Sequence, residues 1–181
     1  QGLFEHTLIF FLCDNGGANN NQARNSPLKG FKGIEYEGGH RVPFLISWPK
    51  QFAKGVNFKG LTSSLDIFPT ALEATGIKII PSYGLDGVSL MPFLNAGNNN
   101  NPHEQLVWRK DAAAAIRSGQ YKMIRVKGLG ERLYNLNQDP EETKDVRFQK
   151  PEIFRALKKQ LVSWEKDKMK PIWTEGAIWD T

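Results

Sequence analysis

Short apolar runs and one helical period organise the first hundred residues of the chain. Leu8–Cys13 is a continuous apolar run that ends in Asp-Asn-Gly-Gly, which predicts a strand buried on both faces. Phe44–Trp48 is a second such run and predicts another strand. Residues 63–76 space their apolar side chains at helical intervals, with a serine as the N-terminal cap and Gly76 as the C-terminal cap. These strands, the helix after them and the polar residues at the end of the first strand together predict an α/β layer with a parallel sheet.

The pattern changes after an asparagine-rich segment, residues 95–102, which is the best candidate for a linker. Beyond it, strand-like runs alternate with turns, and this alternation predicts an antiparallel meander. The runs are residues 106–108, 113–117, 122–126 and 132–135. Pro151 then starts a helical period that continues to Trp164, and we expect this helix to pack on the meander. We therefore predict two domains, residues 1–102 and residues 103–181.

Two candidate metal ligands, Asp14 and Asn15, follow the first predicted strand at its carboxyl end. Ligands of open α/β sheets bind outside the carboxyl ends of the strands, and a carboxylate beside a carboxamide offers hard oxygen atoms to Ca²⁺ or Mg²⁺. Lys32, between Gly30 and Gly33, adds a cation that is suited to an oxyanion. The plain alternatives are a turn cap for the first pair and a solvated loop cation for the lysine.

An ordered set of motifs makes the chain resemble the sulfatases. The motifs are Asp-Asn-Gly at residues 14–16, Pro-Leu-Lys-Gly-Phe-Lys-Gly at 27–33, Tyr-Glu-Gly-Gly-His-Arg-Val-Pro at 36–43, Ser-Leu-Asp-Ile-Phe-Pro-Thr at 64–70, Ala-Ile-Arg-Ser-Gly-Gln-Tyr-Lys at 115–122 and Leu-Tyr-Asn-Leu-Asn-Gln-Asp-Pro-Glu-Glu at 133–142. Each motif is weak alone, but their order is specific, and the resemblance spans residues 7–165. It implies an α/β fold in which the end of an alkaline-phosphatase-like parallel-sheet layer is followed by a small α+β subdomain, an antiparallel sheet plus a C-terminal helix.

The resemblance implies a sulfuric ester hydrolase that uses calcium. Asp14 and Asn15 match two ligands of Ca²⁺, which sulfatases hold jointly with aspartates from an N-terminal part, and Lys32 matches a lysine that contacts a sulfate oxygen. The implied substrate is a sulfated small molecule or glycan. Arg109 and Lys110 lie at a predicted hairpin tip that approaches the active-site mouth in similar sulfatases. They are therefore candidates for substrate binding, with plain solvation as the alternative.

The nucleophile of that family is missing from the chain. Sulfatases convert the Cys or Ser of an N-terminal Cys/Ser-x-Pro/Ala-x-Arg segment to formylglycine, and no such segment occurs here. The only cysteine, Cys13, is expected to be a small buried hydrophobic residue. We therefore interpret the chain as the C-terminal portion of a sulfatase, whose partner is the missing N-terminal part. We expect the chain alone to be inactive, and the resemblance suggests a periplasmic or secreted protein.

Other charged residues have structural interpretations. Glu37 and Arg41 are expected to form an internal ion pair that braces their loop. The acidic cluster at residues 139–142 is expected to form a turn, because Asp-Pro after a strand is a turn former. His40 occupies a variable position of its motif, and His103 is expected at the surface.

Charge and hydropathy weigh against two classes of partner. The chain has 24 basic and 19 acidic residues, a net charge of +5, but the two signs are interleaved, so we expect no nucleic acid partner. No apolar stretch approaches the ~20 residues that a membrane span requires.

Two alternatives to a sulfatase stay open. The first is a phosphoester or phosphonate ester hydrolase of the same superfamily, which uses a similar scaffold for a tetrahedral oxyanion. The second is a noncatalytic module that binds sulfated glycans, although the spacing of the aromatic residues is more typical of a core than of an exposed sugar platform. Those residues are Trp108, Tyr121, Tyr134 and Trp164.

Overall fold

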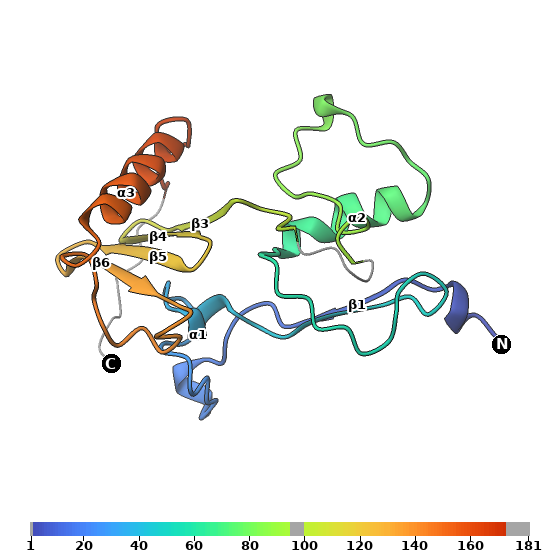
Figure 1. Cartoon of the computed structure of the whole chain (residues 1–181), viewed down its shortest axis with the longest axis horizontal. Helices are drawn as coiled ribbons and strands as arrows, with labels where there is room; N and C mark the ends of the chain where they lie inside the picture. Colours follow the sequence, from blue (N-terminus) through green and yellow to red (C-terminus); the bar gives the residue numbers. More distant parts are fainter. Residues whose placement is uncertain (1, 95–99, 173–181) are drawn as a thin grey trace. The chain divides into compact units, whose positions relative to one another are not determined.

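The chain forms two compact units in a computed structural model that describes residues 2–94 and 100–172 (Figure 1). One unit is Gln1–Leu12 together with Pro43–Glu104, and the other is Cys13–Val42 together with Gln105–Thr181. Each unit therefore joins two segments that are distant in the sequence. The division into residues 1–102 and 103–181 stays a prediction, and most of the candidate linker lies outside the described residues.

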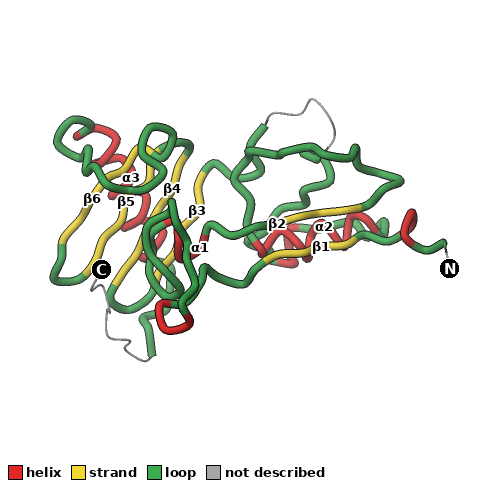
Figure 2. The backbone as a smooth tube through the Cα atoms, turned by 90° about the horizontal axis from the view of Figure 1, so that it is seen from below, coloured by secondary structure: helices red, strands yellow, loops and turns green. Residues whose placement is uncertain are grey.

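The first unit contains two strands, β1 (Ile9–Leu12) and β2 (Phe44–Ser47), which run side by side in Figure 2. They pair antiparallel, with Ile9 opposite Ser47 and Leu12 opposite Phe44. The α/β class is confirmed, but the parallel arrangement expected from the sequence is not what these two strands form. The reason is the connection: a parallel neighbour needs a crossover that carries the chain back to the first end of the strand, whereas here β2 begins opposite the end of β1.

Burial of the first strand was predicted wrongly. Its residues alternate between exposed and partly buried, and Phe11 is 64% exposed. On the paired strand Leu45 is also exposed. A continuous apolar run alone does not say whether both faces of a strand are covered. Cys13, which follows the strand rather than lying within it, is exposed as well, so the expectation of a buried thiol was wrong.

The predicted helix of the first unit is confirmed. A 3-10 turn at Ser64–Asp66 leads directly into α2 (Ile67–Ala74), and Gly76 follows at φ +78°, a left-handed conformation suited to glycine. Ser63 and Asp66 form a capping box. Further 3-10 turns occur at Phe4–His6, Asn19–Asn21 and Pro81–Tyr83.

Asp66 also connects the helix to the rest of its unit. Its buried carboxylate accepts hydrogen bonds from the backbone N–H of Ser63 (2.7 Å) and Val88 (3.0 Å), and it lies 2.8 Å from Nε2 of His103. The His103 side chain is only 11% exposed, so the surface position expected from the sequence was wrong. The Asp66–His103 pair is accounted for by this structural role.

The second unit is built on a sheet whose four described strands are hydrogen-bonded in sequence order. They are β3 (Gln105–Arg109), β4 (Ala113–Ser118), β5 (Tyr121–Val126) and β6 (Gly130–Asn135). All three pairings are antiparallel, which confirms the predicted meander. Gly119 and Gly128 adopt positive φ angles, +53° and +83°, in the turns that follow β4 and β5.

Alternate side chains of this sheet belong to two different cores. One face packs on α3 (Pro151–Lys166) through Leu157 and Leu161, which confirms the predicted helix and its position. The opposite face packs on Ile34 and Tyr36, from the segment that precedes α1 (Glu37–His40). Figure 1 shows α3 and α1 on opposite sides of the strands. The motif-bearing loops of the second unit therefore rest on the sheet face that α3 leaves free. No helix in the described part of the chain is long and apolar enough to cross a membrane.

Candidate functional site

Backbone hydrogen bonds bring the candidate metal ligands and the candidate cation into one group of loops. The N–H of Gly16 donates to the carbonyl of Gly39 (2.9 Å), and that of Gly38 donates to the carbonyl of Lys29 (2.7 Å). The N–H of Lys32 donates to the carbonyl of Gly17 (3.1 Å). The loop that carries Asp14 and Asn15 and the loop that carries Lys32 are thus both fastened to the α1 turn and to each other.

Asn25 fastens the same loops a second time. Its Oδ1 accepts the N–H of Gly17 (2.8 Å), and its Nδ2 donates to the carbonyls of Gly17 (3.1 Å) and Gly30 (2.9 Å). One carboxamide therefore satisfies three backbone groups of two loops. Asn25 could not be identified from the sequence, because a lone asparagine in a polar loop gives no signal of such a role.

Glycines are required where these segments touch. A Cβ atom on Gly16 would lie 1.7 Å from the carbonyl oxygen of Gly38, and one on Gly39 would lie 2.0 Å from that of Ile34. Both neighbours are backbone atoms, which move only with their whole loop. The Glu-Gly-Gly motif therefore has a packing explanation: it allows the loops to approach the α1 turn closely.

The side chains of Asp14, Asn15 and Lys32 extend from this fixed backbone. Asp14 and Lys32 are exposed. Nδ2 of Asn15 donates to the carbonyl of Gly16 (2.9 Å), which leaves its Oδ1 as the atom that can bind a cation. The Asp14 carboxylate accepts the N–H of Asn15 (3.0 Å) through Oδ1.

These donors fit a hard cation, but only as part of a site. Carboxylate and carboxamide oxygens are ligands that Ca²⁺ accepts, and Ca²⁺ takes about six to eight oxygens. In residues 2–94 and 100–172 no group of three or more His, Cys, Asp or Glu side chains could hold a metal ion. The two oxygen donors of this chain would therefore need further ligands from elsewhere.

The two candidate substrate-binding residues lie at the tip of the β3–β4 hairpin, as predicted: Arg109 ends β3, and Lys110 follows it in the connection to β4. The ammonium group of Lys110 donates to the carbonyl of Gly33, directly after Lys32. The guanidinium group of Arg109 donates instead to the carbonyl of Met169, in the segment after α3. Lys110 is thus close to the candidate oxyanion loop, whereas Arg109 faces the C-terminal segment.

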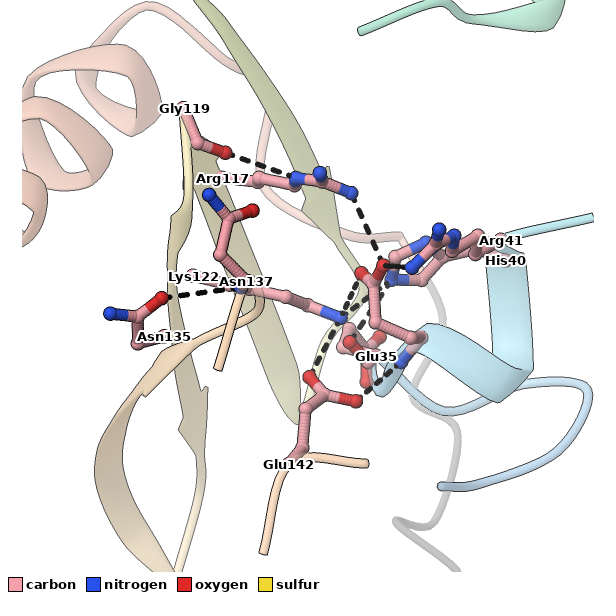
Figure 3. Close-up of polar contacts among 10 residues, drawn as sticks. Glu35, His40, Arg41, Arg117, Gly119, Lys122, Asn135, Asn137 and Glu142 are labelled. Carbon is pink, nitrogen blue, oxygen red and sulfur yellow. Dashed lines mark hydrogen bonds and ion pairs between the residues drawn. The ribbon is translucent and has the colours of Figure 1, made fainter. Parts of the chain in front are cut away.

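A buried ion cluster anchors the α1 turn to the sheet (Figure 3). The carboxylate of Glu37 lies 3.0 Å from Nζ of Lys122, 3.2 Å from the guanidinium of Arg117 and 3.7 Å from that of Arg41. Glu142 accepts the backbone N–H of Glu37 (2.6 Å) and lies 3.0 Å from the same lysine nitrogen. Glu37, Glu142 and Lys122 are at most 1% exposed. The predicted Glu37–Arg41 pair is confirmed as the outermost contact of a larger cluster.

Part of this cluster contradicts the sequence analysis. The turn at residues 139–142 is confirmed, because the Asp139 carboxylate accepts the N–H groups of Thr143 and Lys144. Glu142, however, turns inward with a φ of +55° and is buried. Lys122 was overlooked although the sequence carried a signal: it precedes Ile124 and Val126 at alternate positions of one strand, on the face that forms a core.

The electrostatics of the cluster keep Glu37 charged. Burial alone would raise the pKa of the Glu37 carboxyl, but Lys122 and Arg117 outweigh it and lower the pKa below its ordinary value. Burial raises the pKa of Glu142, against the opposing effect of Lys122. Removal of Lys122 would therefore leave two carboxylates in a place that water does not reach.

His40 is kept neutral beside this cluster. Its ring stacks on Trp108 with centroids 4.2 Å apart, and its Nε2 lies 3.0 Å from the carbonyl of Glu35 and 3.2 Å from Nζ of Lys122. Burial, and next the charge of Lys122, lower the pKa of His40 to about 4.

This shift predicts how stability depends on pH. At His40 the unfolded chain binds up to one proton more than the folded chain between pH ~6.5 and ~4, so this residue should make the free energy of unfolding fall as the pH drops through that window, by up to about 3 kcal/mol. His40→Gln should remove this part of the slope. Urea titrations of both proteins at several pH values measure it, and equal slopes would contradict the prediction. The comparison isolates the histidine, because Glu142, whose pKa is raised, contributes with the opposite sign in both proteins.

The chain is similar to known sulfatases over most of its length. The family model described as N-sulphoglucosamine sulphohydrolase, C-terminal, matches residues 31–167. The uncharacterized sulfatase YdeN of Escherichia coli is 37% identical over 109 residues, which cover 60% of this chain and 19% of that protein. Arylsulfatase A of Homo sapiens is 37% identical over 130 residues, 67% of this chain and 25% of that protein.

A solved structure agrees over nearly the whole chain. Ps i-CgsB, in a complex with k-i-k-neocarrahexaose, is 33% identical, with a TM-score of 0.84, and the match covers 96% of this chain and 40% of that one. The chain thus spans about a fifth to a quarter of the curated relatives' length.

Proposed function

The chain belongs to the sulfatase family and corresponds to the C-terminal portion of its members. We propose that the loops that carry Asp14, Asn15 and Lys32 form one half of a sulfate ester hydrolase site. The observation that carries this proposal is the set of backbone bonds that fasten both loops to the α1 turn. Two oxygen donors and a cation therefore extend from loops whose positions relative to each other are fixed. An N-terminal part of the intact protein would supply the other half, including the nucleophile, which is formylglycine in this proposal.

Asp14 and Asn15 would bind Ca²⁺ in the complete site. The carboxylate of Asp14 and the Oδ1 of Asn15 would be two of its ligands, and aspartates of the N-terminal part would be others. When bound, the ion would supply electrostatic stabilisation to the oxygens of a sulfate group. The backbone bonds of Gly16 and Gly17 support this role, because they fix the backbone directly after the two ligands.

Lys32 would stabilise the negative charge that develops on sulfate oxygens as the ester bond breaks. A charge that is already positioned before the reaction costs no reorganisation during it, and its effect grows as substrate excludes water. The N–H of Lys32 is bound to the carbonyl of Gly17, so the start of its side chain is fixed. Lys32 therefore suits transition-state stabilisation better than a freely moving surface lysine does.

Arg109 and Lys110 would contact the remainder of the substrate. The contact between Lys110 and the carbonyl of Gly33 supports this, since it brings the hairpin next to Lys32. A sulfated glycan is the proposed substrate, and the saccharide bound to the relative Ps i-CgsB is consistent with this class. We further propose a periplasmic or secreted location, on family resemblance alone.

The proposal is tested on the full-length protein with a chromogenic aryl sulfate. We expect turnover by the full-length protein and none by residues 1–181 alone. Lys32→Ala should lower kcat/KM by roughly 10²–10³-fold, the usual cost of one preorganised charge-stabilising group. Lys54→Ala is a matched control, because Lys54 is also an exposed lysine followed by a glycine. Equal activity of both variants would contradict the role of Lys32.

Two other outcomes would replace the proposal. Hydrolysis of a phosphate or phosphonate ester without hydrolysis of any sulfate ester would favour the phosphoester hydrolase alternative. Binding of sulfated glycans that persists in Lys32→Ala, with no turnover of any ester, would favour the noncatalytic module.

A further inference from the structure

A cavity of about 350 Å³ opens at the tip of the β3–β4 hairpin. Its lining comes from Arg109, Lys110 and Asp111 of the hairpin and from residues 169–172, which follow α3. This volume lies at the lower end of the ~300–1,000 Å³ that is usual for small-molecule sites. The cavity is therefore large enough for a group the size of a sugar unit with its substituents.

The cavity carries more positive than negative charge. Arg109, Lys110 and Lys170 contribute three cations, and Asp111 contributes one carboxylate. Within residues 2–94 and 100–172, none of these three cations forms an ion pair with a carboxylate. Carbonyl oxygens accept from Arg109 and Lys110, but a neutral acceptor leaves the charge uncompensated. An anionic ligand is the class that this lining favours.

The two carbonyl contacts also give the cavity a defined position. The contact between Arg109 and Met169 joins the hairpin to the segment after α3, so the two sides of the cavity are hydrogen-bonded to each other. The contact between Lys110 and Gly33 joins the hairpin to the Lys32 loop. Arginine has five N–H donors and lysine has three, so both side chains retain donors for a ligand.

The rest of the wall is apolar and open to solvent. Met169 is 77% exposed and Ile172 is 80% exposed, with Pro171 between them. Exposed apolar side chains beside cations match the two surfaces of a sulfated sugar, its C–H faces and its anionic groups.

We propose that this cavity is a second anion subsite, which binds a sulfate or carboxylate group of a saccharide whose scissile sulfate is held at Lys32. The inference rests on the proposed function and refines it, because it makes the substrate a saccharide with at least two anionic groups. Lys170 is the residue that no sequence motif marks. It lies far along the chain from Lys32, but in the same compact unit.

The test compares two probes on the full-length protein by isothermal titration calorimetry. One probe is a trisulfated heparin disaccharide, and the other is glucose 6-sulfate, which has a single anionic group. Lys170→Gln should weaken disaccharide binding about tenfold, the usual size of one charge-assisted contact. It should change glucose 6-sulfate binding by less than about twofold, since the monosaccharide occupies only the Lys32 site. The loss should shrink as salt is raised.

A matched variant controls for net charge. Lys159→Gln removes an exposed lysine of α3 that does not line the cavity, and both probes should bind it as they bind the unmodified protein. Arg109→Gln is a second test, but it also removes the contact with Met169. If that variant fails to fold, Lys170→Gln still decides, because no hydrogen bond of its side chain is known among the described residues.

The outcomes separate the subsite from the proposed function. The subsite is overturned if Lys170→Gln weakens both probes equally, weakens neither, or matches Lys159→Gln. The proposed function alone fails if the full-length protein hydrolyses no sulfate ester while the disaccharide preference still depends on Lys170.

Discussion

Lys122→Met is expected to lower the free energy of unfolding by about 3–5 kcal/mol. The substitution keeps most of the side-chain volume but leaves the carboxylates of Glu37 and Glu142 buried without the ammonium group that both of them face at 3.0 Å. Removing one partner of a buried ion pair costs more than the pair itself contributes, because the remaining charge stays desolvated. Urea denaturation of the purified chain measures the loss.

Two further variants show whether charge is the cause. Lys127→Met replaces an exposed lysine in the turn that follows β5 and should change stability by less than about 0.5 kcal/mol. Adding Glu142→Gln to Lys122→Met should recover part of the loss, because Lys122 is the cation beside Glu142, whereas Glu37 keeps its contact with Arg117. If Lys122→Met is as mild as Lys127→Met, the cluster does not hold the α1 turn in the way described.

Gly16→Ala is expected to reduce the sulfatase activity of the full-length protein by roughly 10²-fold or more. Its Cβ would lie 1.7 Å from the carbonyl oxygen of Gly38, so the loop of Asp14 and Asn15 must move away from the α1 turn. A displacement of about 1 Å in a positioned group can cost about 10² in rate. Steady-state kinetics with an aryl sulfate, together with the calcium concentration required for half-maximal activity, measure the effect.

The matched variant is Gly128→Asn. Gly128 has open space around its Cβ position and a φ of +83°, which asparagine tolerates better than other residues. It should retain nearly full activity. Loss of stability in Gly16→Ala with full activity and an unchanged calcium requirement would show that the loop contact matters for folding only.

Local periods explain why most of the second unit was predicted from the sequence. The runs that became β3 to β6 each alternate or cluster apolar residues between turns, and α3 has its helical period from Pro151 onward. The two cores on opposite sides of the sheet follow directly from that alternation. These elements are stabilised by neighbours in the sequence, so their signal is local.

The features that were missed depend on residues far apart in the chain. Lys122 joins Glu37 and Glu142 only because β5 lies under the α1 turn, and no local pattern gives that proximity. The antiparallel pairing of β1 and β2 likewise depends on how the intervening segment returns the chain. The order of the motifs identified Asp14, Asn15 and Lys32 as candidates. It did not show that backbone hydrogen bonds of glycines and the side chain of Asn25 hold their loops together.

The buried cluster and the candidate site are parts of one arrangement within the second unit. Lys122 and Arg117 hold Glu37, the turn of Glu37 holds Gly38 and Gly39, and these glycines hold the loops of Lys29 and Gly16. The first link is a set of ion pairs, the second is the chain itself, and the third is a pair of backbone hydrogen bonds. Stability of the cluster and geometry of the site should therefore change together.

The decisive measurement is a crystal structure of the full-length protein with calcium and sulfate. We expect oxygens of Asp14 and Asn15 within about 2.3–2.6 Å of a bound cation, the usual range for Ca²⁺. We also expect Nζ of Lys32 within hydrogen-bond distance of an oxygen of a sulfate bound to that cation. If both ions are bound while these three side chains point away from them, the proposed roles of Asp14, Asn15 and Lys32 are wrong.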